Sequence, residues 1–136
     1  MQDFKKLQVW QRGHQLTLSI YKATTKFPSA ELFGLTSQIR RASASIPANI
    51  AEGCGRAGGS DLARFLQVAA GSASEVHLIL AHDLGVLPAV QFKTLEGETV
   101  ALKRMLASLI EKVRGEAKQP HSNNVNIRLA RVGAAK

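Results

Sequence analysis

The sequence predicts an all-α fold, an up-down-up-down antiparallel four-helix bundle with an irregular C-terminal tail. Apolar residues recur at steps of three and four in four successive segments, and the connections between these segments are short. A chain of 136 residues buries roughly 65–70% of its unfolded surface, so it needs no disulfide or metal to hold a core. We therefore expect one bundle over residues 1–115 and a basic tail over residues 116–136.

The first two predicted helices cover the N-terminal half of the chain. The first has its N-cap at Asp3 and ends before Pro28, and its apolar face consists of Val9, Gly13, Leu16, Ile20, Ala23 and Phe27. The second spans residues 35–57, and its apolar face consists of Leu35, Ile39, Ala42, Ile46, Asn49 and Gly53. Pro47 has no N–H to donate to the Ser43 carbonyl, so we expect a kink there.

Two further helices complete the predicted bundle. The third is expected from Ser60 or Asp61 to about Leu84, where Gly85 suits a left-handed stop, and its apolar face consists of Leu62, Phe65, Ala69, Ala73, Val76 and Leu80. The fourth starts near Pro88, and its seam is an almost regular heptad of Leu95, Thr99, Leu102, Leu106, Leu109 and Val113. In the tail, residues 125–129 alternate like a strand but have no second strand to pair with.

The third predicted helix contains an unusual run of small residues, Ala69 to Ser74 (AAGSAS). Small residues on every face let backbones approach closely on more than one side. The run therefore indicates either tight packing within the bundle or an additional contact between subunits, and both interpretations stay open.

Positive charge is concentrated in the first half of the chain. The 18 Lys and Arg residues outnumber the 10 Asp and Glu residues, a net charge of +8, and residues 4–56 hold eight of the cations and two of the anions. Such a surface attracts the phosphates of nucleic acid, the largest sequence-independent contribution to binding. We expect RNA or DNA to be bound by Arg40, Arg41 and Arg56, with Lys5, Lys6 and Arg12 as a second patch.

Other interpretations of this charge remain open. The lysines can serve solubility alone, or the basic surface can meet an acidic protein partner without nucleic acid. The twin arginines can also be held in ion pairs, for example with Glu31 or Glu52, while Glu52 and Arg56 have the i, i+4 spacing of a helix-surface pair.

No motif in the sequence predicts catalytic, cofactor-binding or metal-binding residues. The single cysteine, Cys54, has no base linked to it by a recognisable signature, and the Glu-x-x-His pairs of bundle di-iron sites do not occur. The stretch Gly53–Gly58 matches G-x-G-x-x-G, but it follows a helix rather than a strand. It indicates a glycine turn, with capture of one phosphate beside Arg56 as the minor alternative. Asn49 lies on the apolar face of the second predicted helix and is expected to fix register or to bond a neighbouring backbone, with a ligand role as the minor alternative.

The sequence also predicts a cytoplasmic protein without a membrane segment. The N-terminus lacks the apolar run of a signal peptide, and no stretch approaches the ~20 apolar residues that a membrane span needs. Trp10 and Tyr21, about three helical turns apart, share a face and are expected to serve core or subunit packing, with base stacking as the minor alternative.

Several segments together resemble a known family, the four-helix bundle proteins named after the 23S rRNA intervening sequence. The segments that carry the resemblance are FKKLQVW at 4–10, QIRR at 38–41, SIPANIAEG at 45–53 and RFL at 64–66. The resemblance extends over roughly residues 4–115 and implies a four-helix bundle that assembles as a ring-shaped homopentamer. It also implies kinship with the accessory protein of diversity-generating retroelements, a basic pentamer associated with a reverse transcriptase and nucleic acid. It supplies no catalytic residues.

Overall fold

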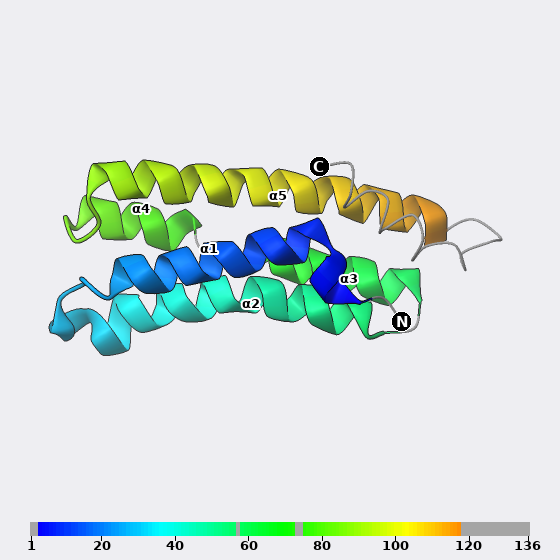
Figure 1. Ribbon diagram of the computed structural model, residues 1–136, viewed down its shortest axis with the longest axis horizontal. Helices are drawn as coiled ribbons and strands as arrows, with labels where there is room; N and C mark the ends of the chain where they lie inside the picture. Colours follow the sequence, from blue (N-terminus) through cyan, green and yellow to red (C-terminus); the bar gives the residue numbers. More distant parts are fainter. Residues whose placement is uncertain (1–2, 57, 73–74, 118–136) are drawn as a thin grey trace.

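The computed structural model describes residues 3–56, 58–72 and 75–117, and within these ranges the chain is all-helical (Figure 1). The helices are α1 (Gln8–Thr24), α2 (Ser37–Cys54), α3 (Gly59–Gly71), α4 (Glu75–Asp83) and α5 (Ala89–Ala117). α3 and α4 follow one another as the third arm of the bundle, so the predicted four-arm, up-down-up-down architecture is confirmed. α2 packs between α1 and α3, and α5 closes the bundle against α1, α3 and α4.

The predicted apolar faces of the first and last arms form the core. In α5 all six predicted seam residues are buried, which confirms the heptad. Along the first arm every predicted face residue is buried except Ala23, which is half-buried. In α2 the aliphatic positions of the predicted face are buried, whereas Ala42 and Asn49 are half-buried where the helix meets its neighbours.

α2 continues through Pro47 without a break. The Ser43 carbonyl, which loses its helical partner at Pro47, accepts a hydrogen bond of 2.9 Å from the Thr17 hydroxyl of α1. That hydroxyl also lies 2.9 Å from the Gly13 carbonyl of its own helix, so one proton serves two acceptors. The two helices approach closely here, because a Cβ on Gly13 would lie 3.3 Å from Ile46 Cγ2. The neighbouring helix thus supplies the donor that the proline removes.

The prediction of one continuous third helix to about Leu84 is wrong. α3 ends at Gly71, and α4 starts at Glu75 in a different rotational phase. α4 buries Leu78 and Ala81, whereas the predicted face residues Val76 and Leu80 are 74% and 45% exposed. Glycine and serine are weak helix formers, and the Ser72 hydroxyl donates to the Val68 carbonyl at 2.9 Å, which competes with continued helix.

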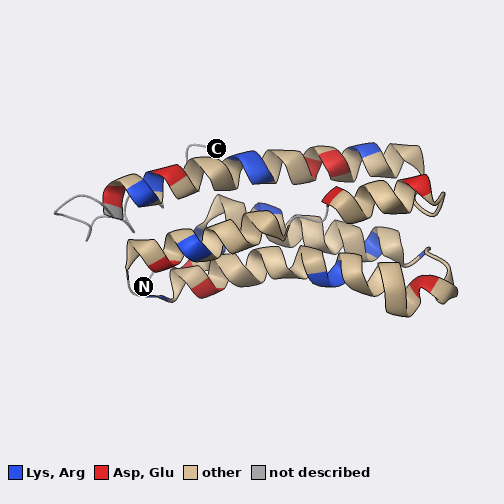
Figure 2. Cartoon of the chain, turned by 180° about the vertical axis from the view of Figure 1, so that it is seen from behind, with Lys and Arg blue, Asp and Glu red and all other residues tan. Residues whose placement is uncertain are grey.

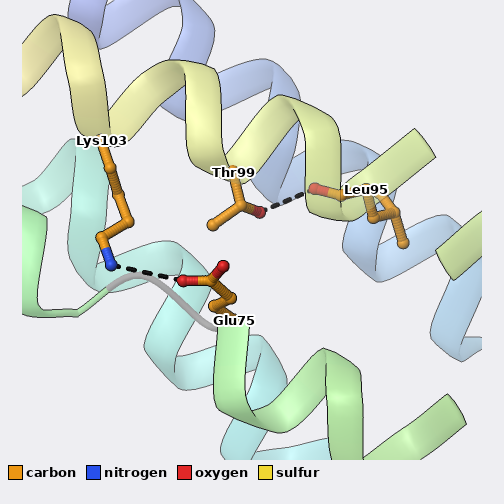
Figure 3. A network of polar contacts seen from close by, with 4 residues as sticks. All are labelled: Glu75, Leu95, Thr99 and Lys103. Atoms are coloured by element: carbon orange, nitrogen blue, oxygen red, sulfur yellow. Dashed lines mark hydrogen bonds and ion pairs between the residues drawn. The ribbon is translucent and has the colours of Figure 1, made fainter. Parts of the chain in front are cut away.

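α4 is fastened to α5 at the point where the third arm breaks (Figure 3). Lys103 of α5 donates to the carboxylate of Glu75, the first residue of α4, at 3.3 Å.

A separate hydrogen bond lies one turn earlier, within α5. The buried Thr99 hydroxyl donates to the Leu95 carbonyl at 2.8 Å. Thr99 therefore faces the core without an unsatisfied hydroxyl.

Glycines define the ends of two arms. A Cβ on Gly53 would lie 2.9 Å from Phe65 Cβ, so the end of α2 packs directly on α3. Gly58, before α3, and Gly85, after α4, have positive φ angles of 106° and 78°, conformations that favour glycine. The predicted left-handed stop at Gly85 is confirmed. Asp3 caps a short 3₁₀ turn, Phe4–Lys6, rather than α1 itself.

The last helix extends slightly further than the sequence pattern indicated. α5 continues to Ala117, past the predicted boundary at residue 115. The alternating stretch at 125–129, and most of the predicted basic tail, lie outside the described residues.

Candidate nucleic-acid interface

The first group of predicted binding residues lies at the N-terminal end of α1. The Asp3 carboxylate accepts from the Lys5 backbone N–H at 3.1 Å and stabilises the 3₁₀ turn, while Leu7 anchors the turn in the core. Lys5 and Lys6 consequently project into solvent, and Arg12 is exposed about one turn into α1. Because α1 and α2 are antiparallel, this group lies at the end of the bundle where α2 finishes.

Arg56 lies at this same end but is already engaged. Its Nε is 3.2 Å from the Glu52 carboxylate, so the predicted i, i+4 pair is present. Both side chains are about half exposed, and an exposed pair of this kind contributes little stability. The guanidinium also lies 5.2 Å from the centre of the Phe65 ring. Arg56 is therefore accessible, although a phosphate has to compete with Glu52 for it.

Arg40 and Arg41 differ although they are adjacent in the chain. Arg40 Nε donates to the Thr24 hydroxyl at 2.7 Å, and Nη2 donates to the Tyr21 carbonyl at 3.3 Å. Its guanidinium lies 4.8 Å from the centre of the Tyr21 ring. Arg40 thus binds the C-terminal end of α1, where a cation is favourable. Arg41 points away from the core and is exposed, and it forms no ion pair among the described residues.

The six predicted residues form two groups rather than one patch. Arg40 and Arg41 lie near the start of α2, whereas Arg56 follows its end, 16 residues later. At 1.5 Å per residue this separation is about 24 Å along the helix axis. Lys5, Lys6 and Arg12 belong to the Arg56 end. Two further exposed cations that were not predicted as binding residues, Lys22 and Lys26, lie at the Arg40 end. Their i, i+4 spacing off the apolar face of the first predicted helix was the available signal.

Charge divides the bundle into two unequal halves. Seven of the eight cations in residues 4–56 are exposed and one, Arg40, is half-buried. Residues 57–117 instead hold six cations and seven anions. Figure 2 shows blue and red segments alternating along α5, and α4 starts and ends with an acidic residue. The α1–α2 half is therefore the basic side of the described structure.

The surroundings of Cys54 disfavour the thiolate form of its side chain. Cys54 is buried, and that burial, with a smaller contribution from the Asp3 charge, raises its pKa to about 11, so the thiol stays protonated at neutral pH. In the part of the chain that the structure describes, no three His, Cys, Asp or Glu side chains are grouped so that they could hold a metal ion. Likewise, none of the described helices combines the length and the apolarity needed to cross a membrane.

Asn49 belongs to a chain of polar contacts between α2 and the end of α3. Its amide donates to the Ser45 carbonyl at 2.8 Å and to the Ser45 hydroxyl at 2.9 Å. The Ser45 hydroxyl lies 3.0 Å from the Ser72 hydroxyl. The expectation that Asn49 bonds a neighbouring backbone is confirmed. The contacts also fix the position of Ser72 against α2 at the break in the third arm.

Trp10 packs between aromatic neighbours. Its ring is 5.1 Å from that of Phe4 in an edge-to-face arrangement and is stacked 4.9 Å from that of His14. Trp10 is half-buried, whereas Tyr21, beneath Arg40, is exposed. Trp10 therefore packs within the subunit, as one form of the prediction stated, whereas Tyr21 is not part of the core.

The chain is similar in sequence to a known protein family and in fold to a solved structure. The family model of the 23S rRNA-intervening sequence proteins matches residues 5–108. The chain belongs to this family. A crystal structure of a protein of unknown function from the S23 ribosomal protein family of Bacteroides thetaiotaomicron VPI-5482 has a similar fold, with a TM-score of 0.68 at 23% identity. The similarity covers 75% of this chain and 97% of that protein. No curated protein matches the chain.

Proposed function

We propose that this protein is a non-enzymatic, homopentameric four-helix bundle that binds RNA or DNA through its basic α1–α2 side. The observation that carries the proposal is the charge division of the bundle. The eight cations of residues 4–56 face only two anions, whereas the remainder up to residue 117 is nearly neutral. Attraction of phosphates depends on such an unneutralised excess of cations.

The cations that are exposed and unpaired are expected to contribute most to phosphate binding. Arg41, Lys5, Lys6 and Arg12 are exposed and form no ion pair within the described residues. Arg40 holds the end of α1, so removing it would also disturb the fold. We therefore assign direct phosphate contacts first to Arg41 and the N-terminal lysines.

Self-assembly is supported by a second observation, the apolar outer face of the third arm. Five of the nine residues of α4 are apolar, and the exposed apolar side chains of the third arm are Val68, Val76, Ile79, Leu80 and Leu84. Grouped exposed apolar side chains mark an interaction surface. Five copies would also repeat the two cationic groups around one assembly, which converts weak single contacts into multivalent binding.

Salt dependence tests the nucleic-acid proposal. Log affinity for a single-stranded RNA or DNA oligonucleotide should fall linearly with log salt concentration, with a slope set by the number of phosphates that the protein neutralises. Arg41→Gln should make that slope shallower by about one for each phosphate that Arg41 neutralises. Arg104→Gln removes an exposed cation of the neutral half, on α5, and should leave the slope unchanged.

Two results would contradict the proposal. Absence of binding at low salt would remove it altogether, and equal slopes for the two variants would remove the assignment to the α1–α2 side. If the protein instead captures an acidic protein in a manner that depends on Arg41 and nucleic acid does not compete, the alternative of a protein-binding assembly factor replaces it.

A further inference from the structure

A groove between α1 and α5 brings together two lysines that the sequence analysis did not single out. Its volume is about 320 Å³, and it is lined by Ser19, Lys22, Ala23, Lys26, Val90, Gln91, Thr94, Leu95 and Glu98. This volume is at the lower end of small-molecule sites, of roughly 300–1,000 Å³. It suits one small ligand and is too small for a folded partner.

The two walls of the groove carry different charges. α1 supplies Lys22, the turn that follows α1 supplies Lys26, and α5 supplies Glu98. No ion pair within the described residues involves any of the three. A ligand can therefore meet these charges without breaking an existing pair.

The antiparallel course of α1 and α5 orders these groups along the groove. The C-terminal end of α1 faces the start of α5, so Lys26, just past that end, lies toward Val90, and Ser19 lies toward Glu98. From Val90 to Glu98, α5 rises about 12 Å. The groove is thus cationic at one end and anionic at the other.

Apolar and polar uncharged groups complete the lining. Ala23, which is half-buried, and Leu95, which is buried, form the apolar part of the groove lining. The Thr94 hydroxyl donates a hydrogen bond to the Val90 carbonyl at 3.1 Å, so the Thr94 hydroxyl oxygen can still accept one from a ligand. Gln91 offers both a donor and an acceptor. These groups can contact the face and the edge of a planar heterocycle.

We propose that the groove binds one nucleoside monophosphate unit, with its phosphate on Lys22 and Lys26 and the exocyclic amino group of its base on Glu98. Lysine is a common phosphate ligand, and a carboxylate accepts from the amino group of cytosine. The opposed charges match a ligand that is anionic at one end and a hydrogen-bond donor at the other. The inference rests on the proposed function in one respect, because the unit can belong to a bound strand or be a free nucleotide.

Free CMP and UMP test the groove directly. They differ at the position where cytosine carries an amino group and uracil a carbonyl. In an NMR titration of the full chain, CMP should shift the backbone amide signals of Ala23, Thr94 and Leu95 and should bind more tightly than UMP. Glu98→Gln should remove the preference for CMP. The double variant Lys22→Gln/Lys26→Gln should weaken CMP binding at least fivefold.

Lys112→Gln provides the matched control, because Lys112 is an exposed lysine of α5 outside the groove. Its CMP affinity should equal that of the parent protein. All the altered side chains are at the surface, and thermal unfolding of each variant checks that the fold is kept. CMP shifts spread over the whole surface, or equal losses in the groove and control variants, would overturn the inference.

A second arm separates the two sources of the ligand and the two proposals. If a single-stranded oligocytidine binds in a salt-dependent manner but CMP leaves the groove signals unchanged, the groove inference fails while the proposed function stands. If CMP binds in the groove and no oligonucleotide binds, the ligand is a free nucleotide and the proposed function fails. Binding of both, weakened together by Lys22→Gln/Lys26→Gln, supports a strand with one base in the groove.

Discussion

Two stretches of this bundle contrast in helix continuity. α2 contains Pro47 in its body and continues unbroken from Ser37 to Cys54. The third arm contains no proline between residues 60 and 84, and yet its first helix stops at Gly71. Propensity alone would place the break in the other stretch.

The difference lies in what neighbouring helices supply. At Pro47, α1 offers the Thr17 hydroxyl to the Ser43 carbonyl and packs Gly13 against the helix. At the end of α3 the Ser72 hydroxyl donates to the Val68 carbonyl at 2.9 Å and lies 3.0 Å from the Ser45 hydroxyl of α2, so the neighbouring helix contacts the chain where α3 ends. Helix continuity here is decided by tertiary partners, as expected when most helical stability comes from packing.

The largest expected effect is at Thr17. Thr17→Val keeps the shape of the side chain but removes the donor, which leaves the carbonyl of the fully buried Ser43 unsatisfied. Unfolding free energy should fall by about 1–3 kcal/mol in chemical denaturation. Thr17→Ser retains the hydroxyl and is the control, with a smaller loss.

Pro47→Ala sharpens the same comparison. An alanine restores the backbone N–H at position 47, which can then serve the Ser43 carbonyl. In a double-mutant cycle, Thr17→Val should therefore cost less in the Pro47→Ala background than in the parent. An unchanged cost would mean that the Thr17 hydroxyl does not replace the missing donor.

A smaller effect of opposite sign is expected at the break in the third arm. Gly71 has no positive φ and an open Cβ position, so Gly71→Ala should stabilise the protein by about 0.5–1 kcal/mol. The same substitution at Gly58, where φ is +106°, should destabilise it. Thermal unfolding of the Gly71→Ala and Gly58→Ala proteins measures both changes in stability. A destabilised Gly71→Ala protein would show that glycine is required at position 71.

The smallest effect on subunit stability, but a large one on assembly, is expected at Val76. This side chain is 74% exposed, so Val76→Glu should change unfolding free energy by no more than about 0.5 kcal/mol. If the outer face of α4 joins subunits, light scattering should report dissociation toward the 14.6 kDa chain. Phe33→Glu, the control, alters an apolar residue that is 93% exposed outside α4. Unchanged assembly in Val76→Glu would exclude the α4 face as the contact.

The sequence by itself determined the four-arm bundle, most of its core and its basic half. The seams of α1 and α5 are long and periodic, so the energy of burying their apolar stripes overrides local variation. Net charge and its division between the halves follow from composition, which folding leaves unchanged. The family could likewise be inferred from local segments such as SIPANIAEG at 45–53.

Only the tertiary structure decided which side chains are available. Arg40 and Arg41 are identical, adjacent residues. Nevertheless, Arg40 forms hydrogen bonds with Thr24 and Tyr21 at the end of α1, while Arg41 is exposed. The groove of Lys22 and Glu98 joins residues from helices far apart in the chain, which periodicity within one helix cannot bring together. The break after Gly71 also escaped prediction, because the contact of the Ser72 hydroxyl with Ser45 of α2 joins residues far apart in the chain. Local sequence fixes periodicity and charge, whereas contacts between helices fix hydrogen-bond partners, and these settle both helix continuity and the accessibility of each cation.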